Sequence, residues 1–349
     1  MKIKDLCSYA PKSRIKAREA ADNAKYLFFT SSADENKRYT DFQFNKEAII
    51  MGTGGNATLH YYNGKFSVST DCLVLLPNSK IKCKYLYYFF KSHMSVLEAG
   101  FKGAGLKHTN KKYIEEINIS EVPDLTTQEK IISHLDTISD NIEKINRELE
   151  LFDSLIKARF VEMFGDYLKD DRRPLSEVAK ITGGLTKNSN RNTFETKMPY
   201  LRVANVFYNM LDLREILEIG VKEEEIEKTL LQAGDLLFVE GNGSIEQIGR
   251  VAIWDGSIDP ILHQNHLIKA RFNNEIIAPE YALFYFMLQD GRQQIISKSV
   301  STSGLNTLSV NKVSSLLLPI PPIALQKQFS VFVKLVDKSK FIQMIVQYK

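Results

Sequence analysis

The sequence predicts an α+β protein with two similar globular domains separated by a pair of long antiparallel helices that form a coiled coil. Three observations lead to this prediction. Residues 123–166 have the apolar spacing of one long coiled-coil helix. Residues 319–349 form a second, shorter stretch of the same kind. Several motifs occur twice in the same order, which indicates an internal repeat with a pseudo-twofold relation.

The central helix is predicted from its opening and its periodicity. It begins at Pro123, because proline is tolerated at the entrance of a helix but not inside it. Thr126 is expected to cap the first turn, with Glu129 completing a capping box. From Ile131 to Phe152 apolar residues alternate in steps of four and three, a stutter follows with a second step of four, and no Gly or Pro intervenes until Gly165. Such a helix is roughly 55–60 Å long, so it needs a partner.

The partner is expected to be the segment at residues 319–349. Its opening, PIPPIALQ at residues 319–326, repeats the opening PDLTTQ at residues 123–128, so that one proline and one glutamine match at a common offset. The second helix has fewer residues, and no counterpart of FVEMFGD at residues 160–166 follows it. We therefore expect a shortened C-terminal helix, which would weaken the helix pair and one partner-binding site.

The segments that precede the two helices also repeat each other. The matching pairs are residues 49–56 and 236–243, 66–75 and 262–268, 84–90 and 280–286, and 103–106 and 302–305. A repeat of this length is too long for a solenoid and predicts two large modules, each ending in a helix. The predicted parts are residues 1–122 (first globular domain), 123–166 (central helix), 167–318 (second globular domain) and 319–349 (C-terminal helix).

The globular parts are expected to combine short strands, short helices and Gly-rich turns. Strands are predicted near residues 26–30, 236–240 and 251–254, and helices at residues 85–93 and 223–231. The Asn63-Gly64 pair stands between two aromatic stretches and predicts a hairpin turn.

Composition limits the class of protein. The chain has 349 residues, 44% of them apolar and 25% charged, which suits two or three globular domains. Three cysteines provide no disulfide framework and favour a reducing compartment, so we expect a cytoplasmic protein. No apolar run is long enough for a membrane span, and the first residues lack a signal-peptide core. The net charge of +4 is compatible with nucleic acid but does not require it.

The motifs of catalytic and metal sites are missing from the sequence. It contains no Gly-x-x-x-x-Gly-Lys phosphate loop, no Gly-x-Ser-x-Gly elbow and no tetrapeptide of an amino-methyltransferase. His263 and His266 form a His-x-x-His pair, but no further ligand stands at metal-binding spacing. We therefore expect neither catalysis nor a metal in this chain.

The arrangement resembles the specificity subunit of type I restriction-modification systems. The resemblance rests on residues 123–131 (PDLTTQEKI), 160–166 (FVEMFGD), 319–326 (PIPPIALQ) and 66–71 (FSVSTD), and on the Gly-Leu pair before each helix. It implies a subunit without catalysis or cofactor, whose two target recognition domains each read one half of a bipartite double-stranded DNA sequence. It also implies that the helices dock two methyltransferase subunits, which bring S-adenosylmethionine, and that motor-nuclease subunits can join them.

Reading DNA requires basic, amide and hydroxyl side chains on loops that reach phosphates and base edges. The DNA-binding candidates are Lys12, Ser13, Arg14, Lys16, Lys102, Lys107, His108, Lys187, Asn188, Asn190, Arg191, Arg202, Asn205, Ser301, Thr302 and Ser303. The candidates for partner binding on the helices are Gln128, Ile131, Leu135, Ile138, Ile142, Ile145, Leu149, Gln326, Phe329 and Val336.

A second interpretation is a non-enzymatic coiled-coil adaptor or scaffold protein that binds other proteins. The duplicated domains do not exclude it. Binding to random duplex DNA distinguishes the two, because affinity that comes from phosphate contacts falls steeply as salt rises. An enzyme acting on nucleic acid is disfavoured by the missing motifs.

Overall fold

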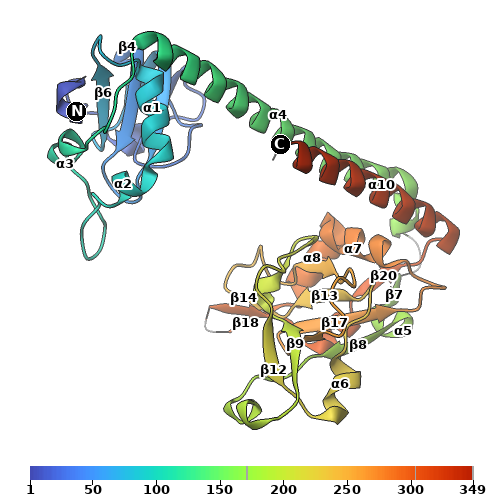
Figure 1. Cartoon of the computed structure of the whole chain (residues 1–349). Coiled ribbons are helices and arrows are strands. Elements are labelled where there is room, and N and C mark those ends of the chain that lie inside the picture. Colours follow the sequence, from blue (N-terminus) through green and yellow to red (C-terminus); the bar gives the residue numbers. More distant parts are fainter. Residues whose placement is uncertain (170–171, 303, 348–349) are drawn as a thin grey trace. The chain divides into compact units, whose positions relative to one another are not determined.

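A computed structural model of the chain describes residues 1–169, 172–302 and 304–347. The chain divides into two compact units, unit 1 (Met1–Lys144) and unit 2 (Ile145–Lys349), with the boundary inside the long helix α4 (Leu125–Phe164). Each unit combines a mainly antiparallel sheet with helices (Figure 1). This confirms the predicted α+β class with two globular domains and a long central helix.

Unit 1 is built on one six-stranded sheet with the order β1-β6-β4-β5-β2-β3. The strands are β1 (Cys7–Tyr9), β2 (Tyr26–Phe29), β3 (Arg38–Tyr39), β4 (Phe44–Gly52), β5 (Leu59–Val68) and β6 (Cys72–Pro77). The helices are α1 (Cys83–Ser92), α2 (Met94–Glu98) and α3 (Lys111–Glu116), with 3-10 turns η1 (Ile3–Asp5) and η2 (Ala17–Glu19). Strand β4 alternates between two cores: Ile49 packs in the cluster that contains α1, and Ile50 packs on the opposite face.

The hairpin predicted at Asn63-Gly64 is wrong. Strand β5 continues through both residues, and Gly64 lies opposite Lys46 in the ladder with β4. The turn signal is overridden because β5 pairs with β4 over eight consecutive positions, a long register that a turn at this point would break. Gly64 instead takes a φ of 147°, which glycine adopts without strain.

Unit 2 contains a central sheet with the order β15-β13-β17-β8 and several smaller ladders. Its strands are β7 (Arg172–Pro174), β8 (Ala179–Gly183), β9 (Lys197–Leu201), β10 (Val206–Phe207), β11 (Met210–Leu211), β12 (Leu217–Gly220), β13 (Leu236–Val239), β14 (Gly241–Asn242), β15 (Val251–Ile253), β16 (Leu262–His263), β17 (Leu267–Phe272), β18 (Val300–Thr302), β19 (Leu305–Thr307) and β20 (Leu317–Pro319). Its shorter helices are α5 (Leu175–Val178), α6 (Glu223–Thr229), α7 (Pro279–Met287), α8 (Gln289–Lys298) and α9 (Val310–Ser314), with turns η3 (Tyr167–Lys169), η4 (Ser189–Thr193) and η5 (Val203–Asn205). Helix α7 is buried from Tyr281 to Phe286, so it is the centre of the unit's core.

The two units repeat one topology. The order β1-β6-β4-β5 of unit 1 matches β8-β17-β13-β15 of unit 2, and every pair in both series is antiparallel. The parallel pairing of β2 with the end of β5 is matched by the parallel pairing of β9 with β16. The motif pairs found in the sequence therefore occupy equivalent places, which confirms the internal repeat.

Helix α4 has 40 residues, as its heptad spacing predicted, but its N-terminal cap differs from the expectation. The carboxylate of Asp124, and not Thr126, accepts hydrogen bonds from the backbone N–H groups of Thr126 and Thr127, each at 3.0 Å. The Thr127 hydroxyl adds a third bond at 2.7 Å. These donors, chiefly the Thr127 N–H, lower the pKa of Asp124, as expected for a carboxylate at a helix N-terminus.

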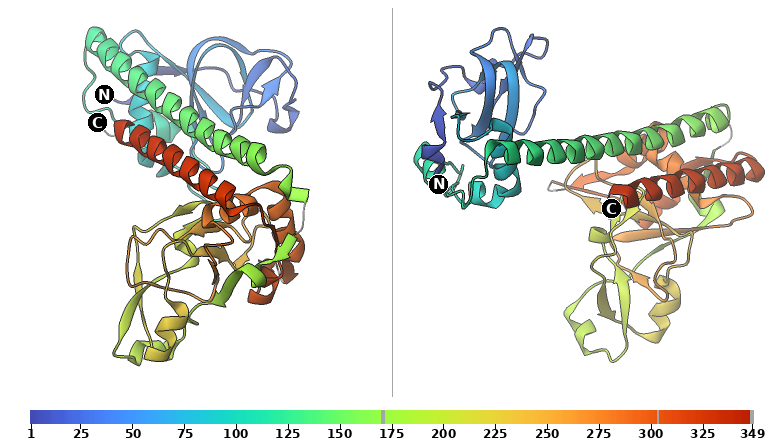
Figure 2. Two further views of the ribbon diagram at one scale, coloured as in Figure 1. Left: turned by 90° about the vertical axis from the view of Figure 1, so that its right-hand side faces the viewer. Right: turned by 45° about the horizontal axis from the view of Figure 1, so that its top comes forward.

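Within unit 2, helix α10 (Ile323–Gln347) lies antiparallel to the second half of α4 (Figure 2). Phe329, near the start of α10, packs against Phe160, near the end of α4, with ring centroids 5.4 Å apart. Further along α10, Lys340 binds Asp153 at 2.5 Å and Gln343 binds Glu148 at 2.8 Å. No helix in the described part of the chain is long and apolar enough to cross a membrane.

Candidate nucleic-acid interface

In unit 1, the Gly-rich turn after β4 meets a loop that is distant in sequence. The N–H of Thr53 donates to Asp71 O at 2.8 Å, and the carbonyl of Thr53 accepts from Thr109 N at 3.0 Å. The loop itself closes through two reciprocal backbone bonds between Lys102 and His108, at 2.9 and 3.0 Å. We call this meeting of turn and loop the unit 1 edge, formed by residues 52–56, 69–71 and 102–109.

The unit 1 edge brings together the two groups of DNA-binding candidates predicted in this domain. Lys102, Lys107 and His108 are exposed on the loop, and Gly55 N donates to Lys107 O at 2.9 Å. The basic N-terminal segment joins the same edge, because Thr70 N donates to Ile15 O at 2.8 Å. Its side chains Lys12, Arg14 and Lys16 are exposed.

Ser13 lies in this segment but is a structural residue. Its side chain is 5% exposed, and its hydroxyl oxygen accepts hydrogen bonds from Gln43 Nε2 at 2.9 Å and Ile15 N at 3.1 Å. This corrects the expectation that Ser13 faces DNA: the hydroxyl holds the segment against the sheet instead.

Unit 2 repeats the same junction at the position that matches Thr53. The N–H of Glu240 donates to His266 O at 2.9 Å, and the carbonyl of Glu240 accepts from Leu308 N at 2.7 Å. Strand β14, which follows Glu240, pairs with β19, and Asn306 Nδ2 reaches Asn242 O at 3.3 Å. We call this junction the unit 2 edge, formed by residues 240–243, 264–266 and 305–308.

The loop that carries Lys187, Asn188 and Asn190 starts from the unit 2 edge. Leu185 N donates to His263 O at 2.8 Å, and Asn265 N donates to Leu185 O at 2.9 Å. The approach is so close that a Cβ on Gly184 would lie 2.1 Å from His263 O, so only glycine fits there. The three predicted side chains are exposed beyond this crossing point.

Arg191 and Asn205 are buried and held by the protein itself, which corrects their prediction as DNA contacts, whereas the partly exposed Arg202 stays a prediction. Arg191 is 7% exposed and forms a fork with the Glu225 carboxylate at 2.8 and 3.0 Å, which lowers the pKa of Glu225. Asn205 is 3% exposed and donates to the carbonyls of Asp212 and Glu215. Arg202 binds the Glu215 carboxylate at 2.7 Å.

The last predicted group is Ser301, Thr302 and Ser303. Ser301 and Thr302 lie in β18, which pairs with β19 of the unit 2 edge. Ser303 lies outside the described residues.

The prediction missed several polar residues of the two edges. His266 Nδ1 lies 2.7 Å from Glu240 Oε2, and Ser31 Oγ donates to Asp71 O at 2.6 Å. Thr53 and Asn242 lie in the repeated Gly-rich motifs, so the repeat was the signal that marked them. The repeat alone does not identify the whole edge, because the segments that meet each motif come from distant parts of the chain.

On the helices, the matching glutamines form the same network in both units. Gln128 accepts from Lys82 N at 2.7 Å and donates to the carbonyls of Pro123 and Lys80 at 2.8 and 3.2 Å. Gln326 accepts from Ala278 N at 2.9 Å and donates to the carbonyls of Pro321 and Ile276 at 2.7 and 3.0 Å. Both side chains are fully buried.

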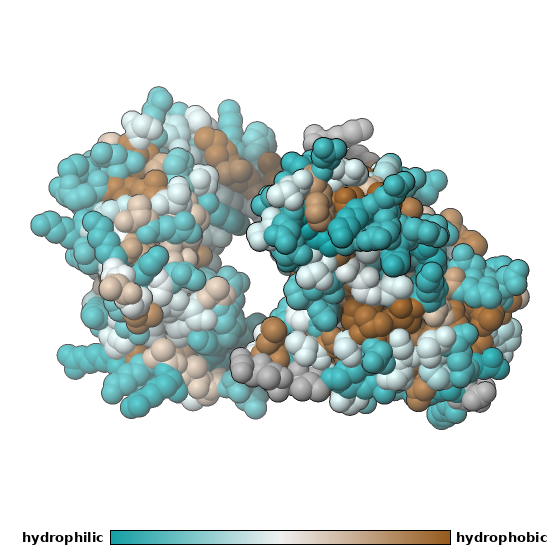
Figure 3. Space-filling view, turned by 90° about the horizontal axis from the view of Figure 1, so that it is seen from below, coloured by the Kyte–Doolittle hydropathy of each residue, from teal (hydrophilic) through white to brown (hydrophobic). Residues whose placement is uncertain are grey.

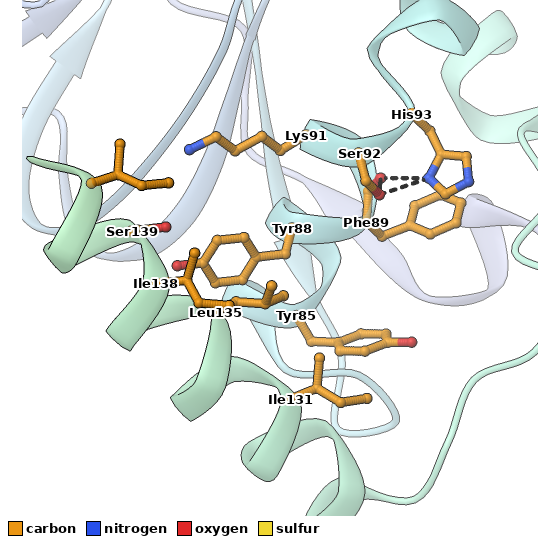
Figure 4. Close-up of a pocket in the computed structure, with 11 residues that line it drawn as sticks. Tyr85, Tyr88, Phe89, Lys91, Ser92, His93, Ile131, Leu135, Ile138 and Ser139 are labelled. Atoms are coloured by element: carbon orange, nitrogen blue, oxygen red, sulfur yellow. Dashed lines mark hydrogen bonds between the residues drawn. The ribbon is translucent and has the colours of Figure 1, made fainter. Parts of the chain in front are cut away.

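This burial corrects part of the predicted partner-binding set. Gln128 and Gln326 fasten each long helix to its own unit, and Phe329 and Val336 belong to the unit 2 core. Ile145 is also buried, and Leu149 is partly buried. Ile131, Leu135, Ile138 and Ile142 instead line an open groove beside α1 (Figure 4), with Ile138 and Ile142 53% and 39% exposed.

An ion pair next to each glutamine is also repeated, but with its charges exchanged. In unit 1, Lys84 on α1 binds Asp136 on α4 at 2.7 Å. In unit 2, Glu280 on α7 binds Lys334 on α10 at 3.2 Å. Both pairs join a short helix to the long helix at matching positions.

No group of three or more His, Cys, Asp and Glu side chains that could hold a metal ion occurs within residues 1–169, 172–302 and 304–347. His263 is fully buried, and Nδ1 lies 2.8 Å from Thr229 O. Burial lowers its pKa to about 4, so it stays neutral at physiological pH. His263 is therefore a structural residue that packs in the interior of unit 2.

Comparison with known proteins adds three findings. A family model described as "Type I restriction modification DNA specificity domain" matches residues 1–151 and 171–344. The EcoKI specificity subunit of Escherichia coli K12 is 25% identical over 309 residues, which cover 80% of this chain and 65% of that protein. The putative MjaX specificity subunit of Methanocaldococcus jannaschii is 32% identical over 177 residues, or 50% of this chain and 40% of that protein.

A solved structure shares the fold. The S subunit of a type I restriction-modification system from M. genitalium superposes with a TM-score of 0.63 at 16% identity, covering 100% of this chain and 91% of that one. The chain thus spans less than two thirds of the length of the two curated relatives above.

Proposed function

Because the chain belongs to the type I restriction-modification DNA specificity family, we propose that it reads a bipartite DNA sequence, with one half bound by each unit. The observation that carries this proposal is the repeated junction at Thr53 and Glu240. Each junction gathers loops with exposed cationic or amide side chains at one end of a sheet. A duplicated site suits a target that consists of two separate half-sequences.

The two kinds of exposed side chain suit two tasks. Lys12, Arg14, Lys102 and Lys107 are exposed cations, and no ion pair joins them to another side chain in the described part of the chain. They are therefore free to neutralise phosphates, which fixes the position of a protein on the duplex. Amide side chains such as Asn188 can accept and donate hydrogen bonds at once, which suits base edges.

The helices are proposed to dock two methyltransferase subunits, which supply S-adenosylmethionine, and motor-nuclease subunits can join the complex. Apolar side chains that remain exposed on the helices support this role. They are Leu151 (62%), Leu155 (48%) and Val161 (55%) on α4, and Val331 (59%), Leu335 (61%), Phe341 (59%) and Ile342 (53%) on α10. Figure 3 shows the chain from below, where apolar patches interrupt a largely hydrophilic surface, so exposed apolar side chains also occur away from the helices. Large exposed apolar side chains that are concentrated on two helices are candidates for an interaction site.

The chain itself is proposed to be a non-catalytic, cytoplasmic subunit. Its task would then be recognition alone, and methyl transfer would belong to the partner subunits. Support comes from the lack of catalytic motifs in the sequence.

Salt-dependent binding to duplex DNA tests the proposal. The affinity of the chain, alone and with its methyltransferase partner, would be measured against salt concentration. Replacing Lys102 and Lys107 together by alanine is expected to weaken binding and to reduce the salt slope by roughly 1–2, because each lost phosphate contact contributes about 0.9. The matched control replaces Lys46 and Lys80, two exposed lysines at the other end of the same sheet.

The control variant should bind like the unchanged chain. Equal losses in both variants would show that the lysines act through net charge alone, which would refute the assignment of the unit 1 edge. If no salt-dependent binding occurs with or without the partner, the adaptor interpretation is favoured instead.

A further inference from the structure

Unit 2 contains a polar loop whose exposed side chains are not occupied by the protein itself. The loop covers residues 186–193 and includes η4, and we call it the Asn-rich loop. Lys187, Asn188, Asn190 and Asn192 are exposed on it. Within the described residues, no hydrogen bond or ion pair involves these four side chains. Three amides that can each donate and accept hydrogen bonds are therefore available to a ligand.

A buried arginine closes the Asn-rich loop at its base. Arg191 Nε donates to Thr186 O at 2.5 Å, and Nη1 donates to Gly220 O at 2.9 Å. The fork with the Glu225 carboxylate adds two bonds, at 2.8 and 3.0 Å. Because Arg191 is 7% exposed and most of its donors are used, it fixes the loop and does not itself face a ligand.

Helix α6, which carries Glu225, is attached to the central sheet at its C-terminal end. Leu230 O, just after the helix, accepts hydrogen bonds from Lys269 Nζ and Arg271 Nη2 on β17, both at 2.9 Å. Positive side chains at this end of a helix also interact favourably with its dipole. The ion pair of Glu225 therefore connects the Asn-rich loop to a fixed part of unit 2.

Unit 1 has a loop at the equivalent place, with different chemistry. Ile15 O accepts a hydrogen bond from Thr70 N at 2.8 Å, and Leu185 O accepts one from Asn265 N at 2.9 Å. A 3-10 turn follows each of these contacts, η2 in unit 1 and η4 in unit 2. The unit 1 turn carries an exposed cation, Arg18, whereas the unit 2 turn carries amides. The two loops thus share a position in the repeat but suit different contacts.

Building on the proposed DNA reading, we propose that the Asn-rich loop reads base edges in the half-sequence bound by unit 2, and that Arg191 is its positioning residue. An amide matches the paired donor and acceptor of adenine in the major groove, so adenine is the base class that this loop suits best. Ordering the loop before DNA arrives avoids the entropy cost of ordering it on binding. It also holds the amides in one geometry, and discrimination between bases depends on that geometry.

Site selection from a random duplex DNA library tests the proposal. The full chain, assembled with its methyltransferase partner, would first define the two half-sequences. The double variant Asn188→Ala, Asn190→Ala should then lose preference by roughly tenfold at one or two base pairs of one half, which identifies the bases that the loop reads.

Arg191→Lys should lose preference at the same base pairs, also by roughly tenfold. Lysine keeps the positive charge, but its single ammonium group cannot form the fork with Glu225 and reach Thr186 O together. The other half-sequence and the salt slope of binding should stay unchanged, because no phosphate contact is lost. Glu225→Gln should act in the same direction, since it weakens the same fork.

The matched control is Arg172→Lys. Arg172 also binds a carboxylate, Asp290 at 3.2 Å, and a main-chain carbonyl, Leu168 O at 3.0 Å, but it lies in β7, which pairs with β20. This variant should select the same sequence as the unchanged chain. Hydrogen–deuterium exchange without DNA should show faster exchange of residues 186–193 in Arg191→Lys and unchanged exchange in β13 and β17, which separates a moved loop from an unfolded unit.

Three results would overturn the proposal. The first is faster exchange of the loop in Arg191→Lys without any change in the selected bases. The second is an equal loss of preference in both half-sequences. The third is a salt slope that falls by about one in Arg191→Lys together with tighter binding by Glu225→Gln, since Arg191 would then contact a phosphate directly. Failure of the proposed function is distinct, because the unchanged chain would then select no bipartite sequence, and this proposal would fall with it.

Discussion

Replacing Gln128 by alanine is expected to loosen unit 1 and leave unit 2 unchanged. The buried side chain satisfies the Lys82 N–H and the carbonyls of Lys80 and Pro123. An unsatisfied buried polar group costs about 1–3 kcal/mol, and the lower value applies here because these backbone groups are only partly buried. Three such groups suggest a loss of about 3 kcal/mol in the free energy that holds α1 to α4.

Hydrogen–deuterium exchange on the full chain is the suitable assay, because a protein with two units need not have a single free energy of unfolding. A loss of about 3 kcal/mol corresponds to roughly hundredfold faster opening in α1 and the start of α4. Gln128→Met keeps most of the side-chain length without its hydrogen bonds, so it should behave like Gln128→Ala. Lys130→Ala changes a nearby exposed residue on α4 for which no ion pair is found among the described residues, and it should have no effect.

Two results would refute this reasoning. Unchanged exchange in Gln128→Met would show that filling the site matters and that the hydrogen bonds do not. Faster exchange in both units would show that the glutamine does not act locally. Gln326→Ala provides the reciprocal experiment, and it should loosen only α7 and α10 in unit 2.

Four further predictions follow from the same structure. Since burial lowers the pKa of His263 to about 4 while the unfolded value stays near 6.5, unit 2 should lose about 3 kcal/mol of stability as pH falls from 6.5 to 4, and His263→Gln should reduce this loss in pH-dependent unfolding. Exchanging Lys84 and Asp136 should keep stability within about 1 kcal/mol in thermal unfolding, while changing only one of them to the opposite sign should cost more. Replacing residues 1–122 with those of another family member should change only one half of the DNA sequence selected from a random library. The highly purified chain should transfer no methyl group from S-adenosylmethionine to DNA in a radiolabel assay, and transfer would contradict a purely recognising role.

The long helices were predictable because their signals are local. Alternating steps of four and three run from Ile131 to Phe152 and continue after a single stutter, and the openings at Pro123 and Pro321 can be compared directly. The cap was misassigned by two residues, since Asp124 and Thr126 are both good cap residues and only the geometry separates them.

The site was harder to predict because exposure depends on distant partners. Arg191 has the side chain of a DNA contact, but Glu225, 34 positions further along the chain, binds it in the folded protein. Ser13 and Asn205 are likewise taken up by backbone and side-chain groups of their own unit. A loop side chain can bind DNA only when no other residue of the protein already occupies its hydrogen-bonding groups. The spacing of residues in the sequence does not show which side chains are occupied in this way.

The exchanged charges of the two ion pairs bear on how a duplicated chain folds correctly. Each short helix has two similar long helices on which it could dock, and tandem repeats are prone to such misassembly. If α1 docked on α10, Lys84 would face Lys334, and if α7 docked on α4, Glu280 would face Asp136. Both wrong pairings bring like charges together, while both native pairings bring opposite charges together. Because the positive charge is on the short helix in unit 1 and on the long helix in unit 2, electrostatic repulsion disfavours docking of either short helix on the wrong long helix.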